Sequence, residues 1–226
     1  MKKIILAVLF LAASQVNAGI IIAVGDSNIS SNANSTFFNN VFGSQNVIGL
    51  NSTIDPWALD NWDTTATATA ASYSQSTSLT STALAGADWL IAASGSAYDN
   101  ATMQLIANFL SAGGNLWVGG EAQVFASFAP ANQLLSFLGS TMSLNPVDTS
   151  SYNSSTNTNL DPYTVGTTGF SAVYQSTISG GVALYASNSN AVVSIDRTTF
   201  ASAVPAPSML AIFGIAFAGL ALSRKR

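Results

Sequence analysis

Short apolar runs separated by turn residues dominate the pattern of the first half of the chain. Ile20–Val24, Asn46–Leu50 and Asp88–Ser94 are each mainly apolar over the length of one strand. Continuous runs of this kind are typical of strands that are buried on both faces, as in parallel sheets. Thr36–Phe42 lies between the first two runs and is predicted to form a short helix.

The region Asp88–Gly139 has the clearest order of elements. After its first strand, Asp99 or Asn100 is placed to cap a helix with an apolar stripe at helical spacing. Gly113-Gly114 ends that helix, because glycine tolerates the left-handed backbone found there. The stripe consists of Met103, Ile106 and Leu110, with Leu105 and Phe109 beside them.

A second strand and helix follow at Asn115–Gly120 and Pro130–Leu138, with Gly139 as the cap of the helix. An order of strand, helix, strand and helix is typical of parallel strands joined by crossover helices. We therefore predict a three-layer α/β domain, flavodoxin-like in the broad sense. Its sheet is expected to be mainly parallel, with helices on both faces.

The last third of the chain lacks this helical pattern. Ala172–Gln175, Gly181–Ala186 and Ala191–Ile195 are predicted strands without helices between them, and they can add antiparallel strands at one edge. Thr64–Thr82 and Asp148–Asn159 are rich in Ser, Thr and Asn and are predicted to be loops or edge strands. Because β-branched and polar residues dominate outside Asp88–Gly139, an all-β sandwich is the alternative fold.

Composition excludes several classes of function. The 226 residues contain no Cys and no His, and only 7% of them are charged, with six basic and ten acidic residues. Thiol and imidazole catalysis, thiolate zinc sites and disulfides are therefore excluded. A net charge of −4 argues against nucleic-acid binding. More than a third of the middle region is Ser, Thr or Asn, which take the place of charges at the surface.

The N-terminal end predicts a secretory signal peptide over residues 1–18. Lys2-Lys3 precedes the ten-residue apolar run Ile4–Ala13, which is too short to span a bilayer. Small residues at Val16 and Ala18 suit cleavage after Ala18, which would make Gly19 the mature N-terminus. Residues 19–203 then form a single extracytoplasmic domain.

The C-terminal end, residues 204–226, has three parts in order. Val204-Pro205-Ala206-Pro207-Ser208 is followed by the apolar segment Met209–Leu222 and then by Arg224-Lys225-Arg226. The basic cluster is expected to stay in the cytoplasm by the positive-inside rule, and the two prolines keep the preceding segment extended. An extended segment beside a membrane suits a processing enzyme. An anchor that is never processed is the alternative.

This order of motif, short apolar helix and basic tail resembles the PEP-CTERM sorting signal over Val204–Arg226. Ala206 stands where the common Pro-Glu-Pro core has Glu, and such variants resemble a recurring subtype. The resemblance implies a Gram-negative host, export by the Sec machinery and processing by an exosortase. It also implies a transient inner-membrane anchor, followed by release to the cell surface or to an exopolysaccharide matrix in a biofilm.

The run from Asp88 to Glu121 resembles class I glutamine-amidotransferase-like folds. Phe109–Gly114 carries the F-x-x-x-G-G pattern, and Leu116–Glu121 is the strand and Gly-rich turn that follow it. In active members that turn holds a Cys nucleophile, but here it reads Gly120-Glu121-Ala122. Without Cys or His, amidotransferase chemistry is excluded.

Acidic residues near strand ends are the main candidates for a ligand site. Asp26, Asp99 and Glu121 each follow a predicted strand, at the edge where α/β domains place ligands. Together they could bind Ca²⁺ or act as an acid and base pair, whereas turn and capping roles are the plainer interpretation. Gly25-Asp26-Ser27 also resembles the start of GDSL-type esterases, but Ser27 has no His to activate it.

Two further sets of residues have weaker patterns. Trp57 and Trp62 flank Asp55, Asp60 and Asp63, and they would suit sugar binding if exposed, as would Trp117; core packing is the alternative. The spacing of these acids is not that of an EF-hand loop. Asn-x-Ser/Thr triplets are close to the number expected by chance in this composition; they begin at Asn28, Asn34, Asn51, Asn100 and Asn153.

The sequence therefore predicts an exported, non-enzymatic surface or matrix protein that is sorted by an exosortase. A carbohydrate-active enzyme using Asp26 and Glu121, or a carbohydrate-binding module using Trp residues, is the alternative. The partners expected are the Sec machinery, the exosortase, the membrane and exopolysaccharide. No catalytic residue, metal or cofactor is assigned.

Overall fold

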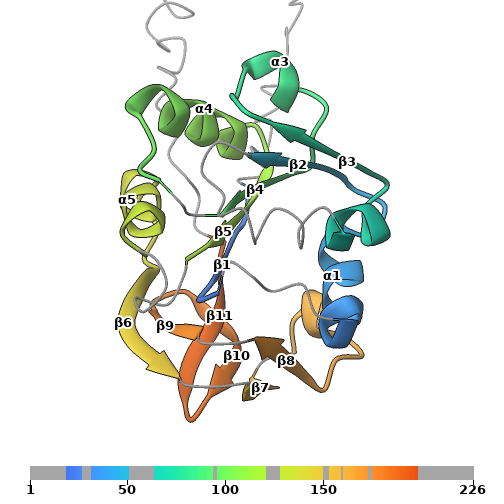
Figure 1. The fold of residues 1–226 in the computed structure, drawn as a ribbon, viewed down its shortest axis with the longest axis vertical. Helices are drawn as coiled ribbons and strands as arrows, with labels where there is room; N and C mark the ends of the chain where they lie inside the picture. Colours follow the sequence, from blue (N-terminus) through green and yellow to red (C-terminus); the bar gives the residue numbers. More distant parts are fainter. Residues whose placement is uncertain are drawn as a thin grey trace, which may run out of the picture.

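One mixed sheet organises the domain in the computed structural model. The structure describes residues 19–26, 32–50, 64–93, 96–120, 128–149, 153–158, 160–172 and 175–197. Eleven strands in these residues form a sheet with the order β3-β2-β4-β5-β1-β11-β10-β7-β8, and β9 and β6 branch from β11 (Figure 1). Of the predicted segments, residues 1–18 and 198–226 lie outside the described residues.

Five parallel strands make up one half of the sheet. Parallel pairing joins β3 to β2, β2 to β4, β4 to β5 and β5 to β1. Four of them, β1, β2, β4 and β5, confirm the strand positions that apolar runs predicted, whereas β3 is a polar strand. These strands are β1 (Ile21–Val24), β2 (Asn46–Leu50), β3 (Ser72–Ser76), β4 (Trp89–Ala93) and β5 (Asn115–Gly119).

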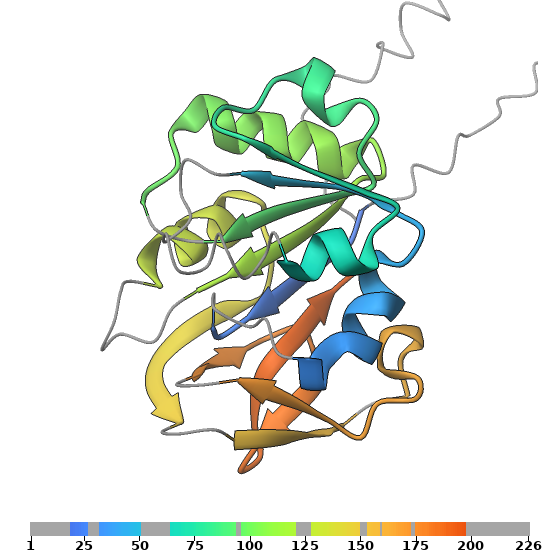
Figure 2. The same ribbon diagram turned by 45° about the vertical axis from the view of Figure 1, so that its right-hand side comes forward.

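Helices cover both faces of this half, because successive strand residues point in opposite directions. Ile21 and Ala23 join one buried cluster, and Ile22 and Val24 join the other. On the first face lie α3 (Ser81–Leu84), α4 (Asn100–Ser111) and α5 (Ala129–Phe137), while α1 (Ser35–Phe42) and a helical turn at residues 64–69 lie on the second (Figure 2).

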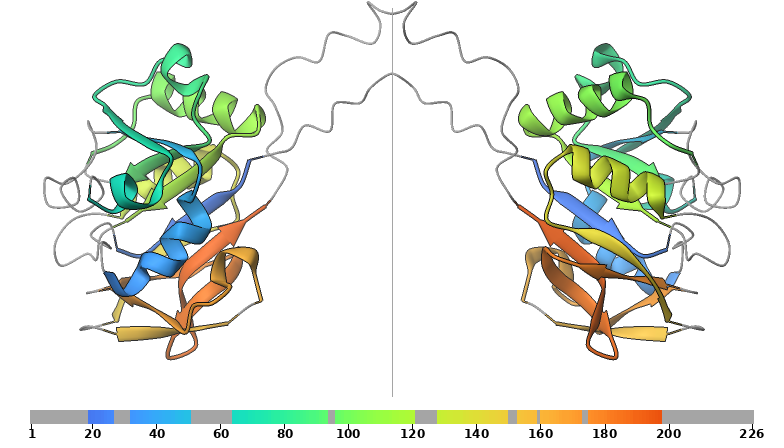
Figure 3. Two further views of the ribbon diagram at one scale, coloured as in Figure 1. Left: turned by 90° about the vertical axis from the view of Figure 1, so that its right-hand side faces the viewer. Right: turned by 90° about the vertical axis from the view of Figure 1, so that its left-hand side faces the viewer.

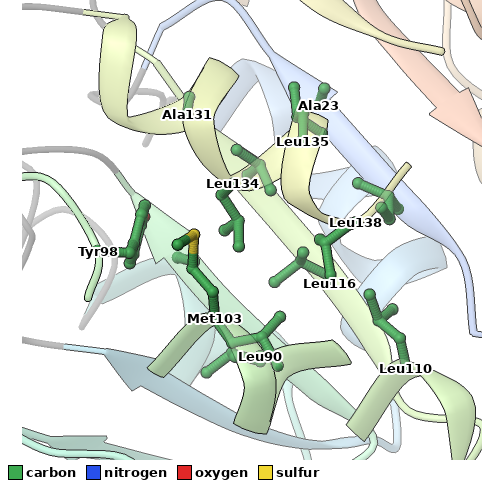
Figure 4. Close-up of a cluster of buried hydrophobic side chains, with 14 of the residues drawn as sticks. Ala23, Leu90, Tyr98, Met103, Leu110, Leu116, Ala131, Leu134, Leu135 and Leu138 are labelled. Carbon is green, nitrogen blue, oxygen red and sulfur yellow. The ribbon is translucent and has the colours of Figure 1, made fainter. Parts of the chain in front are cut away.

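The first cluster is aliphatic and the second is aromatic. Figure 4 shows Leu134 and Leu135 of α5 packed with Met103 of α4 over Leu90 and Leu116 of the sheet. On the other face, three Phe residues of α1 surround the strand tryptophans. Ring centroids there are 5.4–6.0 Å apart for Phe42–Trp89, Phe37–Trp117, Phe38–Trp117 and Phe42–Trp117.

Six antiparallel strands make up the other half of the sheet. β11 (Asn190–Asp196) joins the halves by pairing with β1, with Ile21 opposite Asp196. The other five are β6 (Ser143–Thr149), β7 (Asn153–Asn157), β8 (Gly169–Ala172), β9 (Gln175–Ser179) and β10 (Val182–Ser187). Short 3-10 turns, η1 (Asn32–Asn34) and η3 (Pro162–Thr164), complete this half.

The structure confirms an α/β domain with antiparallel strands, but it corrects the finer expectations. With six antiparallel strands against five, the sheet is not mainly parallel. In the flavodoxin-like order the first strand lies between the second and third. Here β1 lies between β5 and β11, so the order differs. The helices on both faces argue against an all-β sandwich.

Three local predictions also need correction. The single strand predicted at Ala172–Gln175 is wrong, because β8 ends at Ala172 and a separate strand, β9, begins at Gln175. Thr64–Thr82 contains the edge strand β3, as predicted, but also a helical turn and α3. In Asp148–Asn159, β7 is not an edge strand, because it pairs with β10 on one side and β8 on the other.

Candidate functional site

Asp26 lies at the carboxyl end of β1, where the sheet divides. The Gly25 amide donates to the Val192 carbonyl at 3.1 Å, and the Ser176 amide donates to the Gly25 carbonyl at 2.8 Å. A Cβ at position 25 would overlap the Ser176 oxygen, so only glycine fits between the two strands. Asp26 is therefore a buried carboxylate held just beyond this junction. Its esterase-like neighbour, Ser27, lies outside the described residues.

Asp99 has the capping role that the sequence allowed. Its carboxylate accepts a hydrogen bond from the Thr102 amide at 2.7 Å and so caps α4. That backbone hydrogen bond lowers the pKa of the exposed Asp99 carboxyl below its usual range. Since the carboxylate is engaged by its own helix, capping is sufficient to explain the residue.

The convergence of Asp26, Asp99 and Glu121 stays a prediction. Asp26 and Asp99 follow β1 and β4, which are separated in the sheet by β5. Glu121 follows β5 but lies outside the described residues. Within the parts that the structure describes, no group of three acidic side chains is placed to hold a metal ion.

Trp117 is a core residue, which corrects its assignment as a candidate sugar-binding side chain. It is fully buried in β5 and contacts three Phe rings of α1. A ring that no solvent reaches cannot stack on a saccharide. Trp57, Trp62 and the acids Asp55, Asp60 and Asp63 lie outside the described residues.

Asparagine side chains perform a structural role that the sequence reasoning missed. The buried Asn34 amide donates to the Ser171 carbonyl at 2.6 Å, and its oxygen accepts from the Ser171 amide at 2.8 Å. Asn132 makes the same pair of bonds to Leu144, at 2.9 and 2.7 Å. Each side-chain amide therefore bonds to both the carbonyl and the amide of one main-chain residue, as a residue of a neighbouring strand would. The high Asn content was the available signal, but it did not say which residues pair.

The glycosylation triplets are affected by the same contacts. Asn34 begins one of them, yet both ends of its buried amide are engaged, so the folded domain withholds this nitrogen from modification. Asn100 begins another and is exposed in the first turn of α4. Asn28 and Asn51 lie outside the described residues, and the side chain of Asn153 is not described.

An ion pair marks the carboxyl end of β11. Arg197 contacts the Asp161 carboxylate at 2.7 Å, and Asp161 is 6% exposed. Asp161 also accepts from the Tyr163 amide at 3.0 Å, in a capping box with Thr164. The pKa of the Tyr163 hydroxyl is raised, and burial is the largest cause of this shift. Arg197 is the one basic residue between Lys3 and Arg224, and the sequence alone does not show its partner.

Two open pockets lie in the described part of the domain. One, of about 560 Å³, is beside the ion pair and is lined by Asn157, residues 160–162 and residues 164–167. The other, of about 200 Å³, lies between α3 and α4 and is almost entirely apolar. Its lining includes Leu84, Leu105 and Phe109 but no charged side chain, so it offers no groups for acid–base chemistry.

The two chain ends of the domain lie together. The Gly19 amide donates to the Leu110 carbonyl near the end of α4 at 2.9 Å. Because Ile21 pairs with Asp196, the start of β1 lies beside the end of β11, as both views in Figure 3 show. The predicted signal peptide and sorting signal therefore join the domain at the same side.

Comparison with known proteins identifies the C-terminal segment. A family model of the PEP-CTERM protein-sorting motif matches residues 203–226. The match supports export, cell-surface sorting and an exosortase as the sorting enzyme, as the sequence predicted. No curated protein and no solved structure matches the chain, so the amidotransferase-like resemblance of Asp88–Glu121 gains no support. Among the described residues, no helix is long and apolar enough to span a membrane.

Proposed function

We propose that the chain is an exported, non-enzymatic protein of the cell surface or extracellular matrix, processed by an exosortase and associated with exopolysaccharide. The sorting motif at residues 203–226 carries this proposal. The motif follows the domain along the chain, which is the order that such processing needs, with the domain outside the membrane and the basic tail inside.

The other end of the chain fits the same route. Cleavage after Ala18 would place a new α-amino group at Gly19, whose nitrogen lies 2.9 Å from the Leu110 carbonyl at the end of α4. Positive charge is favourable at the carboxyl end of a helix. The mature domain would then begin with a charge that its fold accommodates, and its polar surface would be built from Ser, Thr and Asn.

Sorting is tested by expressing the full chain with and without residues 204–226 in a host that has an exosortase. The full chain is expected at the surface or in the medium, shortened by about the length of the sorting signal. The truncated chain is expected to remain in the periplasm. Restoring the common core with Ala206→Glu is the matched variant and is expected to keep processing. Equal delivery of the truncated and full chains would refute the proposal.

The non-enzymatic part needs a separate test. Purified protein is incubated with the exopolysaccharide of its host, and reducing ends are measured for the wild type and Glu121→Gln. No turnover is expected from either protein. Hydrolysis by the wild type that disappears in Glu121→Gln would favour the carbohydrate-active alternative, whatever the sorting result.

A further inference from the structure

Four large apolar side chains are exposed in the described part of the domain. Phe137 is 43% exposed, Leu160 is fully exposed, Val165 is 67% exposed and Val182 is 48% exposed. They come from α5, the two ends of the η3 turn and the start of β10. Scattered exposed apolar residues are normal in a soluble protein, so their positions decide whether they matter.

All four positions lie near the carboxyl end of β11 or near Arg197, the residue that follows this strand. Val182 is paired with Ile195 across the β10–β11 ladder. Phe137 ends α5, three residues before Ser140, whose hydroxyl donates to the Asp196 carboxylate at 2.6 Å.

The η3 turn reaches the same place through the ion pair. Leu160 is next to Asp161, which binds Arg197 at 2.7 Å, and Val165 lines the same pocket as Leu160 and Asp161. Figure 3 shows η3, the end of α5 and the end of β11 on one side of the domain. We call this side, defined by Phe137, Leu160, Val165 and Val182, the exit face, because the chain leaves the domain there after Arg197.

Charge does not oppose an apolar contact at the exit face. Asp161 is paired with Arg197, and Asp196 is buried and accepts from the Ser140 hydroxyl and the Thr141 amide. The carboxylates closest to the chain exit are therefore already bound by the domain. Arg197, which is 44% exposed, neutralises Asp161, so this pair adds no net charge to the exit face.

Chain length decides what this face meets. Eleven residues, 198–208, separate Arg197 from the apolar segment of the sorting signal, a reach of at most about 40 Å. A domain of this size has a diameter of about 40 Å, so the tether is no longer than the domain and favours orientations in which the exit face is toward the bilayer. A short tether also keeps the local concentration of the attached partner high, which makes a weak contact effective.

We infer that the exit face docks on the outer surface of the bilayer while the sorting signal is still attached. The inference rests on the proposed membrane-anchored step of sorting. Leu160 and Val165 enter the interfacial layer, with Phe137 and Val182 beside them, and the carboxyl edge of the parallel strands, with Asp26, faces away. Four exposed apolar side chains give only weak binding, so removal of the tether releases the domain.

The chain has no Cys, so a single introduced Cys is a background-free site for a fluorescent label. Full-length Leu160→Cys and Val182→Cys carry an environment-sensitive dye in vesicles of phosphatidylcholine and phosphatidylglycerol. Asn190→Cys is the matched control, because this exposed residue begins β11 and lies at its far end from Arg197. Phe213→Cys reports insertion of the sorting segment itself. Spin-labelled lipid quenches dyes at the bilayer, and iodide quenches dyes in water.

Dyes at positions 160 and 182 are expected to be quenched by spin-labelled lipid several-fold more than the dye at position 190, and to be protected from iodide. A second variant adds Leu160→Asp and Val165→Asp to Val182→Cys and is expected to return that dye to water. Asn188→Asp with Asn190→Asp adds the same two charges at exposed positions, so it is the charge-matched control and is expected to leave the dye at the bilayer. All substituted positions are exposed, and circular dichroism verifies folding.

Three results would overturn the inference, and they are distinguishable. If only the dye at position 213 is quenched by lipid, anchoring holds and the exit face does not dock. If dyes at 160 and 182 are shielded from both quenchers, protein covers the face, either a second copy or residues 198–203. If the dye at position 213 is itself not quenched, the membrane-anchored step fails, and the docking fails with it.

Discussion

The Asn34 amide gives the sharpest test of how an almost uncharged domain is held together. Asn34 is buried at the start of α1, and its side chain does not cap that helix. It instead donates to the Ser171 carbonyl at 2.6 Å and accepts from the Ser171 amide at 2.8 Å. Asn34→Asp keeps the size of the side chain but removes the donor. It also places a carboxylate oxygen against the carbonyl.

The expected cost follows from these two contacts. Losing the donated hydrogen bond costs about 1 kcal/mol, and leaving the buried carbonyl without its donor adds about 1–2 kcal/mol. Burial of a charge beside that carbonyl adds to the loss, so we expect a total of about 3 kcal/mol. With a urea m-value of about 2 kcal/mol/M for a domain of this size, the midpoint of unfolding falls by about 1.5 M.

Trp fluorescence in a urea titration measures this change, because Trp89 and Trp117 are buried in the core. The sign of the pH dependence gives a second measurement. A protonated carboxyl can donate to the Ser171 carbonyl as the amide does, so the folded variant binds a proton more readily than the unfolded variant. The free energy of unfolding of Asn34→Asp should therefore rise as pH falls from about 7 toward 4, relative to the wild type.

Asn190→Asp is the control, because this side chain is exposed and the substitution adds the same charge. It should change the free energy of unfolding by no more than about 0.5 kcal/mol. If Asn34→Asp behaves like this control, at neutral pH and across the titration, then the amide does not hold β8 and the reasoning fails.

Gly25→Ala should destabilise the domain by about 2–4 kcal/mol in the same assay, because its Cβ would overlap a main-chain oxygen of β9; Gly86→Ala, where nothing lies within 4 Å, should not. Arg197→Ala leaves the buried Asp161 carboxylate without its cation and should cost about 1–3 kcal/mol, whereas a double-mutant cycle with Asp161→Asn should show coupling. Asp99→Ala should lower the urea midpoint at neutral pH, and Asp99→Asn should lower it less, because Asn also caps helices. The lowered pKa of Asp99 means that its contribution is present above the unfolded pKa and is lost as pH falls through the folded pKa, which an acid titration of wild type against Asp99→Ala measures.

Local signals in the sequence predicted the elements of the parallel half closely. Four continuous apolar runs predicted β1, β2, β4 and β5 within one residue at either end, because burial on both faces leaves no polar alternation. The first α4 residue follows the Asp99 cap, and the left-handed Gly113, with φ of 96°, ends it. Such signals lie within a few residues of the element they define.

The order of the strands could not be predicted in the same way. β1 and β11 are paired although about 170 residues separate them, and nothing in either apolar run selects the other. The strands β3 and β7 consist almost entirely of polar residues, so their composition was equally consistent with loops. The Asn34–Ser171 pair spans 137 residues, and an amide that imitates a strand leaves no local pattern.

The candidate site was predicted less well than the fold for a related reason. Acidic residues at strand ends suggested one ligand edge, but Asp99 is used by its own helix and Asp26 is buried beyond the junction of β1 with β9 and β11. A residue type at a strand end is consistent with capping, packing or binding. Only its hydrogen-bond partners separate these roles.

The scarcity of charge has a consistent physical explanation in this structure. Neutral amides can be buried with both ends hydrogen-bonded at little cost, whereas each buried charge needs a partner. The buried Asn34 joins the start of α1 to β8 in this way, and the half-buried Asn132 joins α5 to β6. Arg197, the one basic residue between the chain ends, is paired with the nearly buried Asp161. The remaining five basic residues lie in the two terminal segments predicted to direct export and sorting. Positive charge is therefore concentrated in the two terminal segments, whereas side-chain amides bind main-chain groups within the domain.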